Sequence, residues 1–135
     1  MAAARLRLIV VTPERQVVDA AADEVQLPGE LGYLGILPGH ATLVTLLKIG
    51  ILSYRDGATA RALAIASGFA EVADDTVSVL ADLAEDKGEI DAGQAERDRA
   101  QAEEALKTAG IDTLEPIRGR LELAQARLEV ARRPS

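Results

Sequence analysis

The single histidine, His40, is the side chain best suited to proton transfer near neutral pH. As a catalytic base it would need a nucleophile and an orienting carboxylate nearby, and no spacing in the sequence indicates such a set. A structural role in the Pro-Gly-His turn at residues 38–40 is the favoured interpretation. Asp74 and Asp75 supply two carboxylates, but adjacent aspartates in a turn lack the spaced ligands of a calcium loop. No metal site is expected.

The sequence carries none of the usual phosphate-binding or thiol chemistry. It contains neither a Gly-x-x-x-x-Gly-Lys-Ser/Thr loop nor a Gly-x-Gly-x-x-Gly loop, which are common cradles for a nucleotide phosphate. The absence of cysteine excludes disulfides and thiolate metal sites and is typical of a reducing compartment. A net charge of −7 argues against nucleic acid as the main partner.

Charge is distributed unevenly, and the last segment has the opposite sign from the rest. Residues 112–135 carry a net charge of +1, whereas residues 1–88 carry −5 and residues 89–111 carry −3. The final segment is therefore the part best suited to an acidic partner. The alternative is that its arginines only complement the dipole of a helix near its C-terminus.

Short alternating runs in residues 1–86 predict an all-β domain. Leu6, Leu8 and Val10 alternate with Arg5 and Arg7, as expected for a half-buried strand. Pro28-Gly29 is expected to end the third strand, and Asp56-Gly57 is the strongest hairpin signal. About eight to ten strands at this spacing predict a sandwich or a barrel.

The character of the sequence changes at residue 87, and the remainder predicts a helical hairpin. Asp91 is expected to cap a first helix that runs to about residue 108, where Ala109-Gly110 stops it. Asp112 is expected to cap a second helix that runs to about residue 133. Pro116 lies in the first turn of that helix, where a missing N–H costs little. The short connection makes the two helices antiparallel.

The second helix carries one narrow apolar seam, whereas the first offers mainly alanine. Members of the seam recur at steps of three and four: Leu114, Ile117, Leu121, Ala124, Leu128 and Ala131. Burying an alanine methyl gives roughly 0.8 kcal/mol at best, and Gly93 or Gly119 costs about 0.5–1 kcal/mol inside a helix. The hairpin is therefore expected to dock weakly, and a weakly docked element can change partners.

Three segments together carry a family resemblance. They are Gly32-Tyr-Leu-Gly-Ile-Leu-Pro-Gly-His-Ala-Thr-Leu43, Gly68-Phe-Ala-Glu-Val72 and Val77-Ser-Val-Leu-Ala-Asp82. With the strand spacing, the linker and the terminal helix pair, the chain resembles the epsilon subunit family of the F-type ATP synthase over nearly its whole length. The resemblance implies a ten-stranded all-β sandwich at residues 1–86, followed by a C-terminal antiparallel α-helical hairpin at residues 87–135.

The resemblance also implies a role without catalysis by this subunit. A central-stalk rotor subunit couples rotation of the c ring to the catalytic head through gamma. The implied partners are the gamma subunit, the c-subunit ring and the catalytic alpha and beta subunits, at the cytoplasmic face of a bacterial cell membrane. In bacterial members the hairpin can leave the sandwich and inhibit ATP hydrolysis. The resemblance implies a complex that translocates protons or sodium ions.

Two groups of contact residues carry over from the family to matching positions. The contact with the c ring and gamma falls on Glu30, Leu31, Gly32, Tyr33, Leu34 and His40. The inhibitory contact with acidic segments of the catalytic subunits falls on arginines of the second helix: Arg118, Arg120, Arg127, Arg132 and Arg133. Tyr33 is placed near the tip of its loop, where an exposed aromatic side chain can anchor an interface.

Some bacterial members bind ATP through an Ile/Leu-Asp-x-x-Arg-Ala motif, from which this chain departs. It reads Ile90-Asp91-Ala92-Gly93-Gln94-Ala95, and the glutamine cannot offer phosphate the charged fork of an arginine. The residues left for weak ATP binding are Glu85, Ile90, Asp91 and Arg127. No cofactor is expected, and an ATP-sensing module within the same complex is the alternative function. A small enzyme that uses His40 is the third hypothesis.

Overall fold

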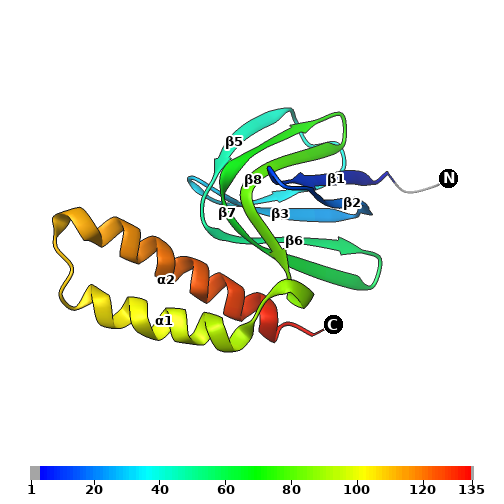
Figure 1. The fold of residues 1–135 in the computed structure, drawn as a ribbon. Coiled ribbons are helices and arrows are strands. Elements are labelled where there is room, and N and C mark those ends of the chain that lie inside the picture. Colours follow the sequence, from blue (N-terminus) through cyan, green and yellow to red (C-terminus); the bar gives the residue numbers. More distant parts are fainter. Residues whose placement is uncertain (1–3, 135) are drawn as a thin grey trace.

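The structure, a computed structural model, describes residues 4–134, so the expected outer limits at residues 1 and 135 lie outside the described residues. Eight strands are followed by a short 3₁₀ turn and two helices (Figure 1). The strands are β1 Leu6–Val11, β2 Gln16–Ala22, β3 Glu24–Gly29, β4 Gly32–Ile36, β5 Leu43–Leu47, β6 Gly50–Asp56, β7 Thr59–Ala73 and β8 Thr76–Asp86. The helical elements are η1 Lys87–Glu89, α1 Ala92–Leu106 and α2 Ile111–Arg132.

The strands form one sheet that folds over on itself into two layers (Figure 1). Its order is β2-β1-β8-β7-β5-β3-β4, and β6 pairs with both β3 and β7. β1 and β8 are parallel, whereas the other pairs are antiparallel. This arrangement confirms the predicted fold class, an all-β sandwich followed by a helical hairpin.

Long strands explain why the structure has eight strands where the resemblance implies ten. β7 has 15 residues, and it pairs with β6 up to Ile65 and with β5 from Gly68 onward. Between these two stretches Ser67 and Gly68 have φ values of 52° and 146°, and this bend carries the strand from one layer to the other. Residues 62–66 and 69–72, on either side of this bend, are therefore parts of one strand.

The core lies between the two layers and consists of aliphatic side chains at alternate strand positions. Leu6, Leu8 and Val10 of β1 are buried, as the alternation predicts, and they pack with buried residues of β3, β6, β7 and β8. Burial of a large aliphatic side chain stabilises the fold by roughly 1.5–3 kcal/mol. The sandwich is therefore held together by its own core and does not depend on the hairpin.

The third strand ends at Pro28-Gly29, as predicted, but it includes both residues. β3 runs to Gly29, and Pro28 and Gly29 pair with Tyr33 and Gly32 of β4. Proline has no N–H to donate, but the Pro28 carbonyl accepts a hydrogen bond from the Lys48 N–H at 2.8 Å. The proline is buried at a position where only its acceptor is needed.

The two helices begin differently from each other. Asp91 caps α1 as predicted, with its carboxylate 3.0 Å from the Gln94 N–H, and the helix ends at Leu106. The predicted cap of α2 by Asp112 is wrong, because Gly110 occupies the cap position and its N–H donates to the Thr113 hydroxyl at 3.0 Å. Among the described residues, neither helix combines the length and the apolar character that crossing a bilayer requires.

Candidate functional site

α2 lies between α1 and the sandwich, as Figure 1 shows. Ala126 and Val130 of α2 are buried against Ile51 of β6 and Ala64 of β7. The helical rotation of 100° per residue places these two residues on the side of α2 opposite the predicted seam. The hairpin is therefore seated on the sandwich by one helix, through residues outside the predicted seam.

The predicted seam itself belongs to the inside of the hairpin. Ile117, Ala124 and Leu128 are buried, and the buried residues of α1 are Ala95 and Ala102. Most of the apolar surface of α2 is therefore used within the hairpin. The seat on the sandwich consists of four buried residues and the half-buried Ala62 and Ile90, and half of these six are alanines.

Polar contacts between hairpin and sandwich gather at the linker end of α2. The Arg127 guanidinium donates two hydrogen bonds to the Glu85 carboxylate of β8. Its Nε lies 2.6 Å from Oε1, and an Nη lies 3.2 Å from Oε2. The Lys87 ammonium donates to the carbonyl of Arg133 at the end of α2. The turn η1 is itself tied to the β1–β2 loop by an ion pair between Arg15 and Glu89.

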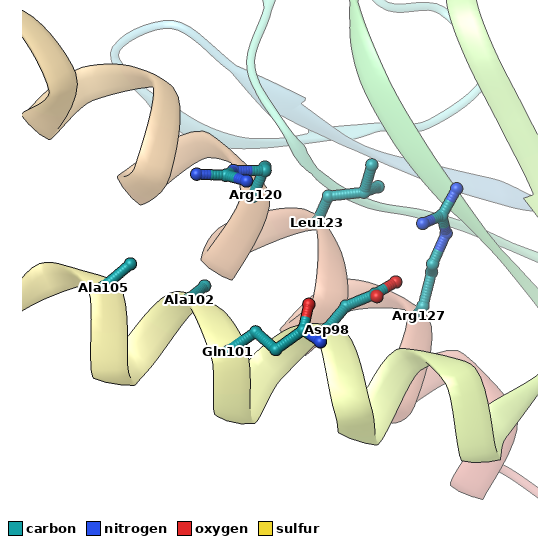
Figure 2. A pocket seen from close by; sticks show the side chains of 7 residues that line it. All are labelled: Asp98, Gln101, Ala102, Ala105, Arg120, Leu123 and Arg127. Carbon is teal, nitrogen blue, oxygen red and sulfur yellow. The ribbon is translucent and has the colours of Figure 1, made fainter.

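A cavity of about 300 Å³ lies between α1 and α2. Its lining consists of Asp98, Gln101, Ala102 and Ala105 of α1 and Arg120, Leu123 and Arg127 of α2 (Figure 2). In Figure 2 the Arg127 side chain points toward the strands and away from α1, in keeping with its bond to Glu85. The lining thus carries two arginines and one aspartate, and one of the arginines, Arg127, is already paired with Glu85.

The four residues predicted for weak ATP binding already have structural partners. Glu85 and Arg127 pair with each other. Asp91 caps α1, and Ile90 packs against the apolar seat of the hairpin. A nucleotide at this place would have to break the ion pair before it could use either charged group.

The predicted contact with a ring of subunits centres on the β3–β4 turn. Gly29 pairs with Gly32, so the turn consists of Glu30 and Leu31 alone, and Leu31 is fully exposed at its tip. Tyr33 is the second residue of β4, two positions from Leu31 at the tip. Its ring is largely exposed, and its hydroxyl accepts a hydrogen bond from the Ile51 N–H at 3.0 Å.

His40 does not join the other predicted contact residues. It follows the far end of β4, so the five residues of that strand separate it from the Glu30–Leu31 turn by about 15 Å at the usual rise per residue. Its backbone N–H donates to the Leu37 carbonyl at 3.1 Å. The neighbouring Gly39 N–H donates to the Asp75 carboxylate at 2.7 Å. Asp75 thus fastens this loop to the β7–β8 turn.

An exposed apolar face was missed by sequence reasoning. Leu46 of β5, Phe69 of β7 and Leu80 of β8 are directly paired in register and are 43–58% exposed. Val44 on the same side of β5 is 65% exposed. The Glu30 N–H donates to the Leu46 carbonyl at 3.0 Å, which brings the row next to the β3–β4 turn. We call Val44, Leu46, Phe69 and Leu80 the apolar face.

Residues 5–87 match the family model of the ATP synthase delta/epsilon chain beta-sandwich domain, which places the described strands within one known domain type. The chain belongs to the ATP synthase epsilon chain family. It is 44% identical over 128 residues to the ATP synthase epsilon chain of Solibacter usitatus, covering 93% of this chain and 95% of that relative. It is also 44% identical over 131 residues to the epsilon chain of Syntrophobacter fumaroxidans, covering 96% and 97%.

A solved structure agrees with this assignment at the level of the fold. The chain superposes with a TM-score of 0.82 and 23% identity on a chain in the Euglena gracilis mitochondrial ATP synthase structure of OSCP, F1 and c-ring, covering 96% of this chain and 82% of that one. Membership in the epsilon chain family makes this protein a non-catalytic subunit and not an enzyme. The hypothesis of a small enzyme built on His40 is therefore set aside.

The remaining chemistry-bearing groups of this epsilon chain have structural roles. Asp74 and Asp75 form the β7–β8 turn with φ values of 51° and 58°. Within residues 4–134 no three metal-binding side chains come together. The two carboxyl groups described next have lowered pKa values, and they also lie outside the candidate sites. Hydrogen bonds hold the pKa of Asp23 and Glu96 below the usual range, from the Gly57 N–H in the first case and from Arg99 in the second.

The five arginines predicted to contact catalytic subunits do not share one face of α2 in this epsilon chain. At 100° per residue, Arg120 and Arg127 lie on one flank, and Arg118, Arg132 and Arg133 point elsewhere. Arg118 bonds Glu115 of its own helix at 2.8 Å. Arg127 is the one among them that is bound to the sandwich within the described residues.

Proposed function

We propose that this epsilon chain is a rotor subunit of the central stalk, where it couples rotation of the c ring to the catalytic head through gamma. The observation that carries the proposal is the apolar face. Four large side chains on the outside of a small sandwich present a surface of the kind that marks a protein interface. Its apolar character fits a lasting contact better than a transient one.

In this proposal the apolar face binds gamma, and the β3–β4 turn reaches the c ring. The fully exposed Leu31 supports the second part, because an aliphatic side chain at the tip of a two-residue turn can enter a small depression on a partner. His40, at the other end of β4, belongs with the gamma contact. The epsilon chain is then peripheral at the cytoplasmic face of a bacterial membrane that moves protons or sodium ions.

We also propose that the hairpin restrains ATP hydrolysis by leaving the sandwich and presenting the arginines of α2 to acidic segments of the catalytic subunits. Support comes from the small seat on the sandwich, which is half alanine. The sandwich has a separate core, so the hairpin can depart without unfolding the strands. A free-energy difference of a few kcal/mol is enough for such an exchange of partners.

Truncation after Gly88 tests the inhibitory role. We expect the truncated chain to fold and to assemble, because β8 and the sandwich core are complete before that residue. The complex that contains it should hydrolyse ATP about fivefold faster than the complex with the full chain, in the range of usual regulatory coupling. Steady-state ATPase assays on the two complexes measure this. Equal rates would show that the hairpin does not inhibit.

We propose that ATP is not a regulatory ligand of this chain. The support is the bidentate bond that occupies Glu85 and Arg127, together with glutamine at position 94. Titration of the isolated chain with millimolar ATP in a calorimeter should release no binding heat. A saturable signal that the Arg127→Gln substitution removes would instead establish the ATP-sensing alternative.

A further inference from the structure

The Glu85–Arg127 pair is the best-formed polar contact between hairpin and sandwich. Both oxygens of the carboxylate meet the planar guanidinium, at 2.6 and 3.2 Å, in the fork geometry that makes arginine–carboxylate bonds strong and directional. Each side chain is only about a quarter exposed (24% and 25%). The pair joins β8 to α2 across 42 residues of sequence, so it closes only when the hairpin is docked.

Apart from the Glu85–Arg127 pair, α2 contacts the strands mainly through small side chains. Ala126 and Val130 contribute small side chains to the apolar seat. Nearer the hairpin tip, α2 passes Ile49 at Gly119, a position without a side chain; a Cβ there would lie 3.7 Å from the Ile49 side chain, in ordinary contact. Loss of the charged contact therefore leaves α2 held to the strands by this small apolar seat and by the bond from Lys87 to the Arg133 carbonyl.

The same guanidinium is one of those that an acidic partner would bind. Arg127 cannot grip Glu85 and a carboxylate of another subunit with the same fork of N–H groups. A helix that leaves the sandwich uncovers Arg127, and a helix that stays keeps it paired. The two contacts therefore exclude each other.

We propose that Glu85 acts as a latch for the hairpin, because it holds Arg127 and so sets how readily α2 leaves the sandwich for an acidic protein surface. The inference rests on the proposed inhibitory function for its consequence in the complex. The latch itself concerns the isolated chain. It assigns to Glu85 a regulatory role opposite to that of Arg127: Glu85 keeps the inhibitor docked, and Arg127 serves both the docked and the released state.

Hydrogen exchange on the full isolated chain tests the latch. Glu85→Gln preserves the shape of the side chain and removes its charge, and amides of α2 should then exchange about fivefold faster than in the wild type. Glu122→Gln is the matched control, because it removes the same charge from an exposed position on α2 and should leave exchange unchanged. Equal exchange in Glu85→Gln and wild type would overturn the proposal.

Exchanging the two charged residues distinguishes the effect of the ion pair from the effects of Glu85 and Arg127 taken singly. Arg127→Gln alone should speed exchange like Glu85→Gln, and the double substitution E85R/R127E should bring exchange back toward the wild-type rate because the pair is restored in reverse. A double variant that exchanges as fast as the single ones would also overturn the latch, since only a paired contact is repaired by exchanging its charges.

Assays on the assembled complex distinguish the latch from the proposed inhibition. Glu85→Gln should lower ATP hydrolysis about fivefold below wild type, because a released hairpin inhibits more often. E85R/R127E should not increase inhibition, since its helix carries glutamate where the acidic partner needs arginine. If exchange responds as expected but hydrolysis is the same in every variant and after truncation at Gly88, the latch stands and the inhibitory function is wrong.

Discussion

Replacing Gly68 by alanine should destabilise the chain by about 3–5 kcal/mol, a large part of the stability of a small domain. A Cβ at this position would lie 2.1 Å from the Leu80 carbonyl oxygen and 2.8 Å from the Ala81 Cα. Both atoms belong to the backbone of β8, which cannot move aside without breaking its pairing with β7. The φ of 146° adds strain for any residue other than glycine. Urea denaturation followed by circular dichroism measures the loss.

Two other glycines provide graded controls for this substitution. Gly57→Ala meets open space but requires a φ of 61°, so it should cost only the left-handed backbone penalty of about 1 kcal/mol. Gly35→Ala meets no atom within 4 Å and carries no such φ, so it should change stability little. If Gly68→Ala unfolds at the same urea concentration as Gly35→Ala, the close approach of β7 and β8 is not what requires glycine.

Elements that depend on neighbours in sequence could be predicted. The alternation in residues 5–10 predicts β1 and its buried face, and Asp91 predicts the start of α1. Asp56-Gly57 predicts the β6–β7 hairpin, in which Asp56 pairs with Thr59 around a two-residue turn. In each case the deciding interaction joins residues a few positions apart, so the physics is readable from the local pattern.

Elements that depend on distant partners could not be predicted in the same way. Pro28 lies inside β3, and its carbonyl accepts a hydrogen bond from the N–H of Lys48, twenty positions later. The start of α2 is a local exception: Gly110 and not Asp112 is its cap, and the Gly110 N–H donates to the Thr113 hydroxyl three residues on. β7 appears as two strands in the sequence because the bend at Ser67 and Gly68 imitates a turn.

The candidate surfaces were hidden for two different reasons. In β5 the exposed Val44 and Leu46 neighbour the buried Leu47, so apolar residues lie on both sides of the strand. The sequence pattern therefore does not indicate which side faces the core. On α2, the stripe that docks on the sandwich has only Ala126 and Val130. The six-residue seam on the other side of the helix is longer, so it dominates the sequence pattern. The sequence predicts that the hairpin must dock, and only the folded chain shows which residues of α2 form the seat.

Taken together, the surfaces assign different lifetimes to different contacts. The apolar face is built on β5, β7 and β8, strands whose inner sides belong to the core, so under the proposed function it offers a lasting partner a rigid surface. The hairpin seat combines a few small side chains with one bidentate ion pair, so it can be exchanged. A rotor subunit that also regulates needs both properties, because torque requires a contact that persists and control requires one that does not.

Placing a charge on the apolar face should weaken binding to gamma while leaving the fold intact. Phe69→Glu adds a carboxylate at the centre of the row between Leu46 and Leu80, where burial against gamma would leave the charge without a partner. A central aromatic of an interface carries about 2–4 kcal/mol, so affinity for gamma should fall at least about 30-fold. Pull-down and titration with gamma measure the loss.

The position of Phe69 lets this result be read without ambiguity. Its side chain is 43% exposed on the outside of the sheet, so the glutamate meets water in the isolated chain and the thermal unfolding curve should stay close to wild type. Ile111→Glu also replaces a large apolar side chain by glutamate, at the 96% exposed first residue of α2, and should bind gamma normally. If Phe69→Glu folds and still binds gamma as tightly as Ile111→Glu, then gamma sits elsewhere. The apolar face would then no longer support the proposed coupling role, because it would not be the contact between this sandwich and gamma.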